Sequence, residues 1–297
     1  MTAAAQMVQS GMLNFERAAA LARHGLGGLG WTAAAILCFL FAPMLWRVAS
    51  VWASDQPNWR NARWDSADLA PDPAQHPEPI IQFYAARTYG WRGILGVHTW
   101  VVFKPRDAVA YTRYEVVGWG VGTGIAALRA SQRPPDGYWA GNRPTVIADK
   151  RGEGVDALIL RLREAVRAYP FPDEYRLWPG PNSNTFTAYL ARALPELHVD
   201  LPPTAIGKDY LPPGEFAALT PGGSGVQLSV VGLLGLTLGM REGIEVNLLG
   251  LVLGLDFLHP ALKLPGIGRV GFPAQPDSVI PVTAASAEIV HSTQQAR

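Results

Sequence analysis

The sequence of 297 residues is poor in charge and in cysteine. Only 16% of its residues are charged, whereas an average soluble domain has about 25%. The 25 basic and 24 acidic residues give a net charge of +1, which excludes the basic footprint of a nucleic-acid-binding protein. The single cysteine, Cys38, excludes an intramolecular disulfide and a cysteine-based zinc site, because each needs at least two sulfurs. Glycine and proline are abundant instead, with 31 and 25 residues.

An uncharged, apolar segment runs from Gly25 to Trp46. An α-helix of about 20 such residues crosses the hydrocarbon core of a bilayer, and tryptophans near both ends of the segment favour the headgroup region. We therefore expect a retained, single-pass transmembrane helix. A cleaved signal peptide and a buried core helix are the alternatives. Arginines flank both sides of the segment, so its orientation is not predicted.

The composition changes along the chain and predicts its organisation. Residues 53–79 are rich in Asp, Pro, Asn and Arg and indicate a linker. The end of the chain lacks periodicity and indicates a disordered tail. We expect five parts in order: an N-terminal segment (1–24), the transmembrane helix (25–52), the linker (53–79), an α+β domain (80–272) and the tail (273–297).

Strand and helix patterns follow one another within the expected domain. Ile80–Ala86, Gly96–Lys104 and Tyr111–Val117 are rich in β-branched and aromatic residues and predict strands of an antiparallel meander. Apolar residues at helical spacing predict an amphipathic helix between Gly152 and Pro170. A second helix is expected to begin within residues 181–186, where Asn and Ser suit an N-cap, and to continue through Ala193.

Two glycine-rich stretches need a separate interpretation. Glycines alternate with other residues from Gly118 to Gly124, but no helix pattern follows, so we expect a turn or a bulged strand instead of a dinucleotide loop. The apolar stretch Val226–Phe257 contains two similar phrases separated by Met240–Gly243 and predicts a hairpin. A second membrane span is the alternative, although charged residues interrupt the run.

Three residues could together form a nucleophilic site. Ser183 lies at the expected start of a helix, where free N–H groups stabilise negative charge. A serine needs a base to remove its proton, and His98 in the second strand could serve as that base. Glu115 in the next strand could orient the imidazole. Each residue also has a structural interpretation: Ser183 as a helix cap and His98 as an ordinary strand histidine.

The residues around Ser183 resemble a known group of enzymes. Tyr175-Arg176-Leu177-Trp178 and the following Pro181-Asn182-Ser183-Asn184-Thr185-Phe186 resemble the motif of the permuted papain-like (LRAT-like and PPPDE-like) group. The order of histidine before nucleophile is that of the permuted group. The resemblance implies an α+β, papain-like fold with an antiparallel sheet and packed helices. It also implies catalytic Ser183, His98 and Glu115, with Asn182, Asn184 and Tyr175 binding substrate. Ser183 replaces the cysteine of that group, so either serine catalysis or a decayed site follows.

A longer stretch of the chain resembles a bacterial family without an assigned activity. His98-Thr99-Trp100, Tyr114-Glu115-Val116, Gly137-Tyr138-Trp139 and the phrase Ala205–Tyr210 are similar to domain of unknown function 3750. The resemblance implies a bacterial protein. With the predicted helix, it places the chain in the bacterial cell membrane, and a periplasmic position of the domain is left open.

These observations predict a membrane-anchored acyl hydrolase or acyltransferase that cleaves an amide or ester. A lipid or lipoprotein substrate is favoured because the expected anchor and apolar hairpin hold the site near a bilayer. We expect the lipid bilayer as a partner, and neither a nucleic acid, a metal nor another cofactor. The alternatives are a non-catalytic, membrane-associated binding module with a decayed site, and a cell-wall peptide amidase.

Overall fold

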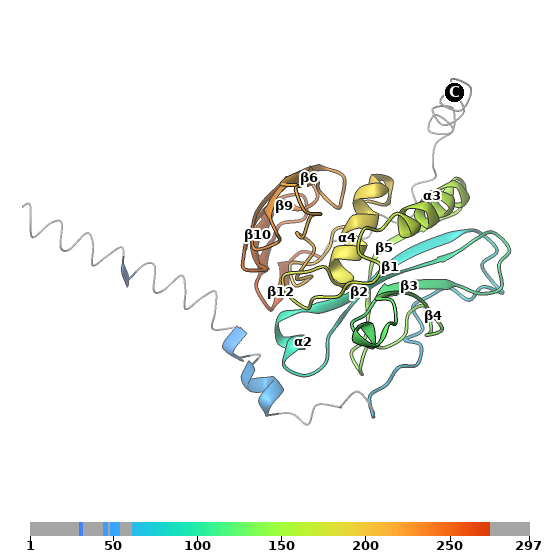
Figure 1. The fold of residues 1–297 in the computed structure, drawn as a ribbon, viewed down its shortest axis with the longest axis horizontal. Coiled ribbons are helices and arrows are strands. Elements are labelled where there is room, and N and C mark those ends of the chain that lie inside the picture. Colours follow the sequence, from blue (N-terminus) through green and yellow to red (C-terminus); the bar gives the residue numbers. More distant parts are fainter. Residues whose placement is uncertain (1–29, 32–43, 47, 54–60, 274–297) are drawn as a thin grey trace, which may run out of the picture. The chain divides into compact units, whose positions relative to one another are not determined.

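The computed structural model describes residues 30–31, 44–46, 48–53 and 61–273. The chain divides into two compact units, Met1–Trp46 and Arg47–Arg297. Besides the helical residues 48–52, the described residues of the second unit form two antiparallel sheets, three α-helices and two short 3₁₀ turns (Figure 1).

The first sheet has five strands in the order β4-β3-β2-β1-β5. The strands are β1 Ile80–Arg87, β2 Val97–Lys104, β3 Thr112–Val116, β4 Leu128–Ser131 and β5 Thr145–Arg151. All neighbours are antiparallel, and β1 pairs with β2 along its full length from Ile80↔Lys104 to Arg87↔Val97. The pairing of β2 with β3 is much shorter and joins only Val101–Phe103 to Thr112–Tyr114. The first residues of β2, Val97 to Trp100, therefore have no ladder partner in β3.

Two helices cover one face of this sheet (Figure 1). They are α3 Val155–Arg167 and α4 Ser183–Ala193, and the short α2 Arg92–Leu95 connects β1 to β2. The buried residues of α3 recur at helical spacing and pack with α4 against β1 and β2. Burying one such aliphatic side chain contributes about 1.5–3 kcal/mol. This core therefore fixes the position of α4, whose first residue is Ser183.

The opposite face of the first sheet is packed by aromatic rings. Tyr84, Trp100, Val102 and Trp139 form a second, smaller core there, and residues of the 61–79 segment such as Trp64 pack against it. The rings of Tyr84 and Trp100 stack at a centroid distance of 5.5 Å. Alternate residues of β2 thus face two different cores, which explains why its burial is continuous.

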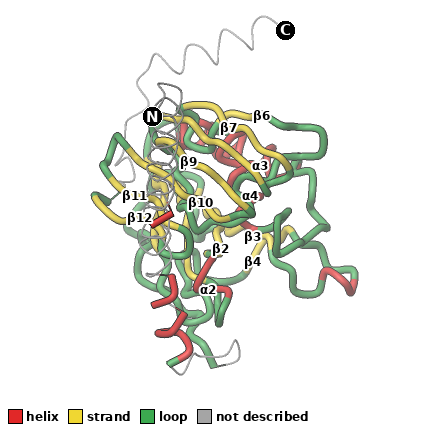
Figure 2. The backbone as a smooth tube through the Cα atoms, turned by 90° about the vertical axis from the view of Figure 1, so that its left-hand side faces the viewer, coloured by secondary structure: helices red, strands yellow, loops and turns green. Residues whose placement is uncertain are grey.

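The second sheet has seven strands in strictly sequential order from β12 to β6. They are β6 Ala217–Leu219, β7 Gly225–Val230, β8 Leu234–Gly239, β9 Gly243–Leu248, β10 Leu251–Asp256, β11 Ala261–Leu264 and β12 Gly268–Gly271. Figure 2 looks toward this sheet and shows its strands side by side. The 3₁₀ turns η1 Val121–Thr123 and η2 Pro195–Leu197 complete the elements.

Several local predictions are confirmed. The three expected strands of an antiparallel meander are β1, β2 and β3, and the two expected helices are α3 and α4. The glycines around residue 120 form a turn, with Gly120 and Gly124 in the left-handed region at φ of 82° and 84°.

The predicted fold class is wrong. The described residues contain twelve strands in two antiparallel sheets and few helices, so they do not form the expected α+β, papain-like arrangement of a sheet with packed helices. The stretch Val226–Phe257 is also more than one hairpin, because it contains four strands, β7 to β10. Each of the two similar apolar sequences includes a turn between two of these strands. Glycines and left-handed residues such as Val231 and Leu249 make these extra turns.

The predicted single-pass location in a bacterial membrane is corrected as well. Among the residues that the structure describes, no helix has the length and apolar character needed to cross a bilayer. Most of the predicted span, Gly25–Trp46, lies outside the described residues, as does the expected tail after Pro273.

Candidate functional site

A cavity of about 470 Å³ opens where β2 and β3 separate. The walls come from the start of β2, the end of β3, α2 and the N-terminus of α4. Most of its lining is apolar or aromatic. The lining side chains include Tyr89, Arg92, His98, Trp119, Trp139, Tyr175, Leu177, Trp178, Asn182, Ser183 and Asn184.

His98 is held in this cavity by a carboxylate and an aromatic ring. Its Nε2 lies 3.1 Å from Glu115 Oε2, and its ring stacks on Trp139 with centroids 3.6 Å apart and an angle of 13°. Nδ1 makes no hydrogen bond to any residue in the described part of the chain. Burial lowers the pKa of His98, although Glu115 opposes the shift. The imidazole is therefore neutral at pH 7 and keeps one nitrogen unoccupied.

Glu115 also bonds a buried arginine. Arg113 Nη2 donates to the same oxygen, Glu115 Oε2, at 2.9 Å, and both side chains are almost fully buried. Burial alone raises the pKa of Glu115, but the His98 hydrogen bond and the Arg113 charge outweigh it and bring the pKa far below its usual range. Glu115 is thus an ionised carboxylate that fixes the ring of His98.

Ser183 is the first residue of α4, and it does not cap the helix. The N-cap is Asn182, whose side chain accepts from the N–H groups of Asn184 and Thr185, while Thr185 Oγ1 accepts from Asn182 N–H. This capping box occupies the other free N–H groups of the helix start. Neither Oγ nor the N–H of Ser183 bonds to another described residue.

The remaining predicted site residues also line the cavity. The amides of Asn182 and Asn184 are engaged in structure, since both donate to the carbonyl of Ile206 and Asn184 donates also to Val97. Gly207, with φ of 98°, leaves room for Asn182 because a side chain there would collide with its amide. These contacts give both asparagines a structural role.

Tyr175 reaches the cavity beside Gly118. A Cβ at Gly118 would lie 2.5 Å from the ring of Tyr175, so glycine is needed for this approach. The Tyr175 hydroxyl makes no hydrogen bond within the described residues, and burial raises its pKa. It is a protonated hydroxyl available to a bound molecule.

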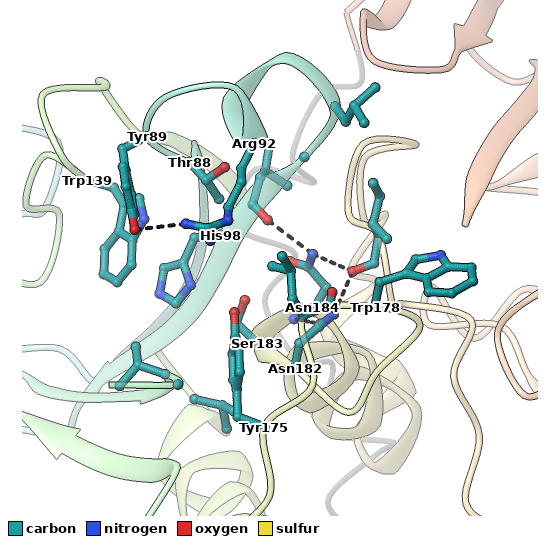
Figure 3. Close-up of a pocket in the computed structure, with 18 of the residues that line it drawn as sticks. Thr88, Tyr89, Arg92, His98, Trp139, Tyr175, Trp178, Asn182, Ser183 and Asn184 are labelled. Carbon is teal, nitrogen blue, oxygen red and sulfur yellow. Dashed lines mark hydrogen bonds between the residues drawn. The ribbon is translucent and has the colours of Figure 1, made fainter. Parts of the chain in front are cut away.

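Two of the three predicted catalytic residues, Ser183 and His98, line one cavity, and Glu115 is not part of its lining. Figure 3 shows Ser183, His98 and Tyr175 among the side chains that line it. The His98 ring lies on the side of β2 that carries Trp100 and Trp139, whereas the next residue, Thr99, donates to the carbonyl of Ser183. Glu115 lies behind His98, on Nε2. No hydrogen bond joins Ser183 to His98 among the described residues.

Sequence reasoning missed four further residues of the site. Arg113 and Trp139 fix Glu115 and His98, while Arg92 and Trp178 line the cavity. Arg113 could have been found, because it lies two residues before Glu115 and alternate residues of a strand share a face. Trp178 and Trp139 stand in phrases that carry a family resemblance, but no strand or helix periodicity indicates that they or Arg92 reach the cavity, because they lie in loops or in the short α2.

No group of three or more metal-binding side chains occurs within the described residues. Arg92 is the cation that lines the cavity; its Nη1 donates to Tyr89 at 2.8 Å, and its buried Nε has no partner in the described part of the chain. The cavity therefore combines apolar walls, an unpaired serine, a neutral histidine and a guanidinium group.

Comparison with known proteins gives one match. Residues 78–210 match the family model described as Protein of unknown function (DUF3750). The matched region includes every residue of the site. No curated protein and no solved structure matches the chain.

Proposed function

We propose that the protein is an acyl hydrolase or acyltransferase in which Ser183 attacks an ester or amide carbonyl. The observation that carries this proposal is the arrangement of His98, with Nε2 on the buried Glu115 and Nδ1 unoccupied in the cavity that Ser183 also lines. An oriented, neutral imidazole is the group that a serine nucleophile requires.

The reaction follows from these positions. As Ser183 Oγ forms a bond to the carbonyl carbon, its proton passes to His98 Nδ1 and the carbonyl π electrons move onto oxygen. The unoccupied N–H of Ser183 and the Tyr175 hydroxyl supply donors for this oxyanion. When the tetrahedral intermediate collapses, the bond to the leaving alcohol or amine breaks and the leaving group takes the proton from His98. Water or an acceptor alcohol or amine then attacks the acyl-serine in the same manner.

Glu115 has a fixed role in this scheme. Its negative charge stabilises the imidazolium that forms in each step, and its hydrogen bond holds Nε2 away from the cavity. Arg113 keeps the carboxylate ionised, so Glu115 orients His98 without taking its proton.

The lining of the cavity favours an apolar acyl group. Side chains such as Leu177, Trp119 and Trp178 are complementary to a hydrocarbon chain. Arg92 is suited to an anionic group on the same substrate. A lipid or lipoprotein ester or amide combines both features, and a polar cell-wall peptide fits the walls less well.

A non-catalytic binding module is the second candidate. It is favoured by one observation, the absence of a hydrogen bond between Ser183 and His98 among the described residues. In that case the cavity binds an apolar ligand and Ser183 has no chemical task.

Fluorophosphonate labelling and hydrolysis of a series of p-nitrophenyl acyl esters distinguish the two functions. We expect Ser183→Ala to abolish both, His98→Ala to reduce both by at least about 100-fold, and Ser183→Cys to retain acyl transfer. Ser66→Ala is the control, because Ser66 does not line this cavity. Labelling that survives Ser183→Ala contradicts serine catalysis, and ligand binding without turnover favours the binding module.

A further inference from the structure

The seven-stranded sheet directs its apolar side chains outward. Strand register aligns them in rows across the sheet: Leu219, Val226, Leu238, Ile244, Leu255, Leu262 and Val270 form one row. A second row contains Leu228, Leu236, Val246 and Leu253. Most of these side chains are about half exposed, for example Val246 at 51%. We call this surface the outer face; Figure 2 shows its strands from the front.

The inner side of the same sheet is polar and buried. Gln227, Thr237, Glu245 and Lys263 alternate with the outer residues, and each is at most 3% exposed. Lys263 Nζ lies 2.7 Å from Glu245 Oε1, and Lys208 pairs with the other oxygen of the same carboxylate. An antiparallel sheet with one face in water normally has the reverse pattern, apolar inside and polar outside. The outer face therefore exposes the apolar residues that such a sheet normally buries.

We propose that the outer face docks on a lipid surface. Its rows consist of Val, Leu and Ile and present no charged group, whereas protein interfaces usually add aromatic residues, arginine and a polar rim. The sheet is also curved, with its outer face convex in Figure 1. Two copies of a convex face touch only along a strip, so a second copy of the chain is a poor fit. A fluid lipid surface adapts to the curvature.

The outer face adjoins a residue that lines the cavity. This residue, Trp178, donates from Nε1 to the carbonyl of Leu249 in the β9–β10 turn at 2.9 Å. Trp178 and Leu249 are 51% and 55% exposed, so an apolar surface continues from the sheet to the cavity. A lipid chain can pass along this surface toward Ser183. This last step rests on the proposed function, but docking itself does not.

Docking through this face is a contact with the lipid surface and needs no membrane-spanning helix. Because the outer face has no charge, its contact does not depend on electrostatic attraction. Salt screens charged contacts and leaves apolar ones largely unaffected. We therefore expect binding to uncharged, zwitterionic lipid at both low and high ionic strength.

Sedimentation of the full chain with phosphatidylcholine vesicles tests the proposal. The combined variant Leu228→Thr, Val246→Thr and Leu253→Thr removes apolar surface from one row and retains strand-forming residues. We expect it to weaken vesicle binding by about 100-fold. The matched control is Val109→Thr, Ile125→Thr and Leu160→Gln, three exposed apolar residues outside the sheet, which should bind like the wild type. Circular dichroism checks that both variants fold.

Several results would overturn the proposal. The first is a wild-type chain that stays in the supernatant, and the second is vesicle binding that disappears at high salt. The third is vesicle binding that the outer-face variant retains, because another segment would then be responsible for the binding. Light scattering that shows a lipid-free dimer, lost in the outer-face variant, assigns the face to a second copy instead. Ser183→Ala should bind vesicles normally, so failure of docking and failure of catalysis are distinguished.

Discussion

Removal of the Glu115 charge should strongly destabilise the fold. Glu115 compensates the buried guanidinium of Arg113 at 2.9 Å and orients His98 at 3.1 Å, and all three side chains are at most 5% exposed. Glu115→Gln leaves Arg113 as a buried cation without its counter-charge, and breaking a buried pair in this way costs about 3–5 kcal/mol. In a domain of this size, 1 kcal/mol shifts the midpoint of thermal unfolding by about 2–4 °C. We therefore expect a decrease of about 6–20 °C.

The chain contains a matched control for this measurement. His76 and Glu78 form a similar pair with Nδ1 and Oε1 3.0 Å apart, but their side chains are 39% and 31% exposed. Since such pairs contribute at most about 1 kcal/mol, Glu78→Gln should lower the midpoint by less than about 4 °C. Calorimetry of both variants at pH 7 provides the comparison. Equal shifts would refute the conclusion that burial makes the Glu115 cluster strong.

Three further predictions concern the site and the inner side of the second sheet. Burial lowers the pKa of His98 below its ordinary 6.5, so the imidazole stays neutral down to a lower pH. The rate of fluorophosphonate labelling should therefore fall to half of its maximum only at a pH below 6.5. Arg92→Gln should raise KM about tenfold for an anionic ester and leave a neutral ester unaffected, as measured by steady-state kinetics. Glu245→Gln leaves the buried ammonium of Lys263 without its closest carboxylate and should cost about 3–5 kcal/mol in urea unfolding.

The first sheet and its helices can be predicted because their patterns are local. Three β-rich segments with short connections, Ile80–Ala86, Gly96–Lys104 and Tyr111–Val117, determine an antiparallel meander. The apolar spacing of α3 and the cap residues of α4 are equally local. Even so, the sequence does not predict that β2 and β3 pair over only three residues. The cavity opens where this pairing ends.

The second sheet is larger than the sequence predicts, for a different reason. Val226–Phe257 does alternate, with Gln227 and Glu245 between apolar residues, but alternation alone does not reveal which side is buried. The usual assignment puts apolar residues inside, and here it fails. The strands β11 and β12 are four residues each and offer too short a pattern for recognition.

The site shows the same division between local and long-range information. The chemistry of histidine, glutamate and serine predicts a joint site, and the structure places His98 and Ser183 in the lining of one cavity and bonds Glu115 to His98. Trp139, which stacks on His98, comes from a loop, so no periodicity in the sequence reveals it. The N-cap is Asn182, one residue before Ser183, because Asn182 and Thr185 form the capping box. Ser183 takes no part in that box.

The inverted sheet and the low charge of the chain have one physical explanation. Turning apolar rows outward requires that the inner side of the sheet be polar, and buried charges are tolerated only where partners compensate their desolvation. Glu245 bonds both Lys208 and Lys263, and Lys263 also bonds Asp200 at 3.1 Å, so each charge has a partner of opposite sign. The second sheet thus uses its few charges inside and leaves none for its outer face. Only 16% of the residues are charged. This small number is sufficient because the outer face carries no charged side chains.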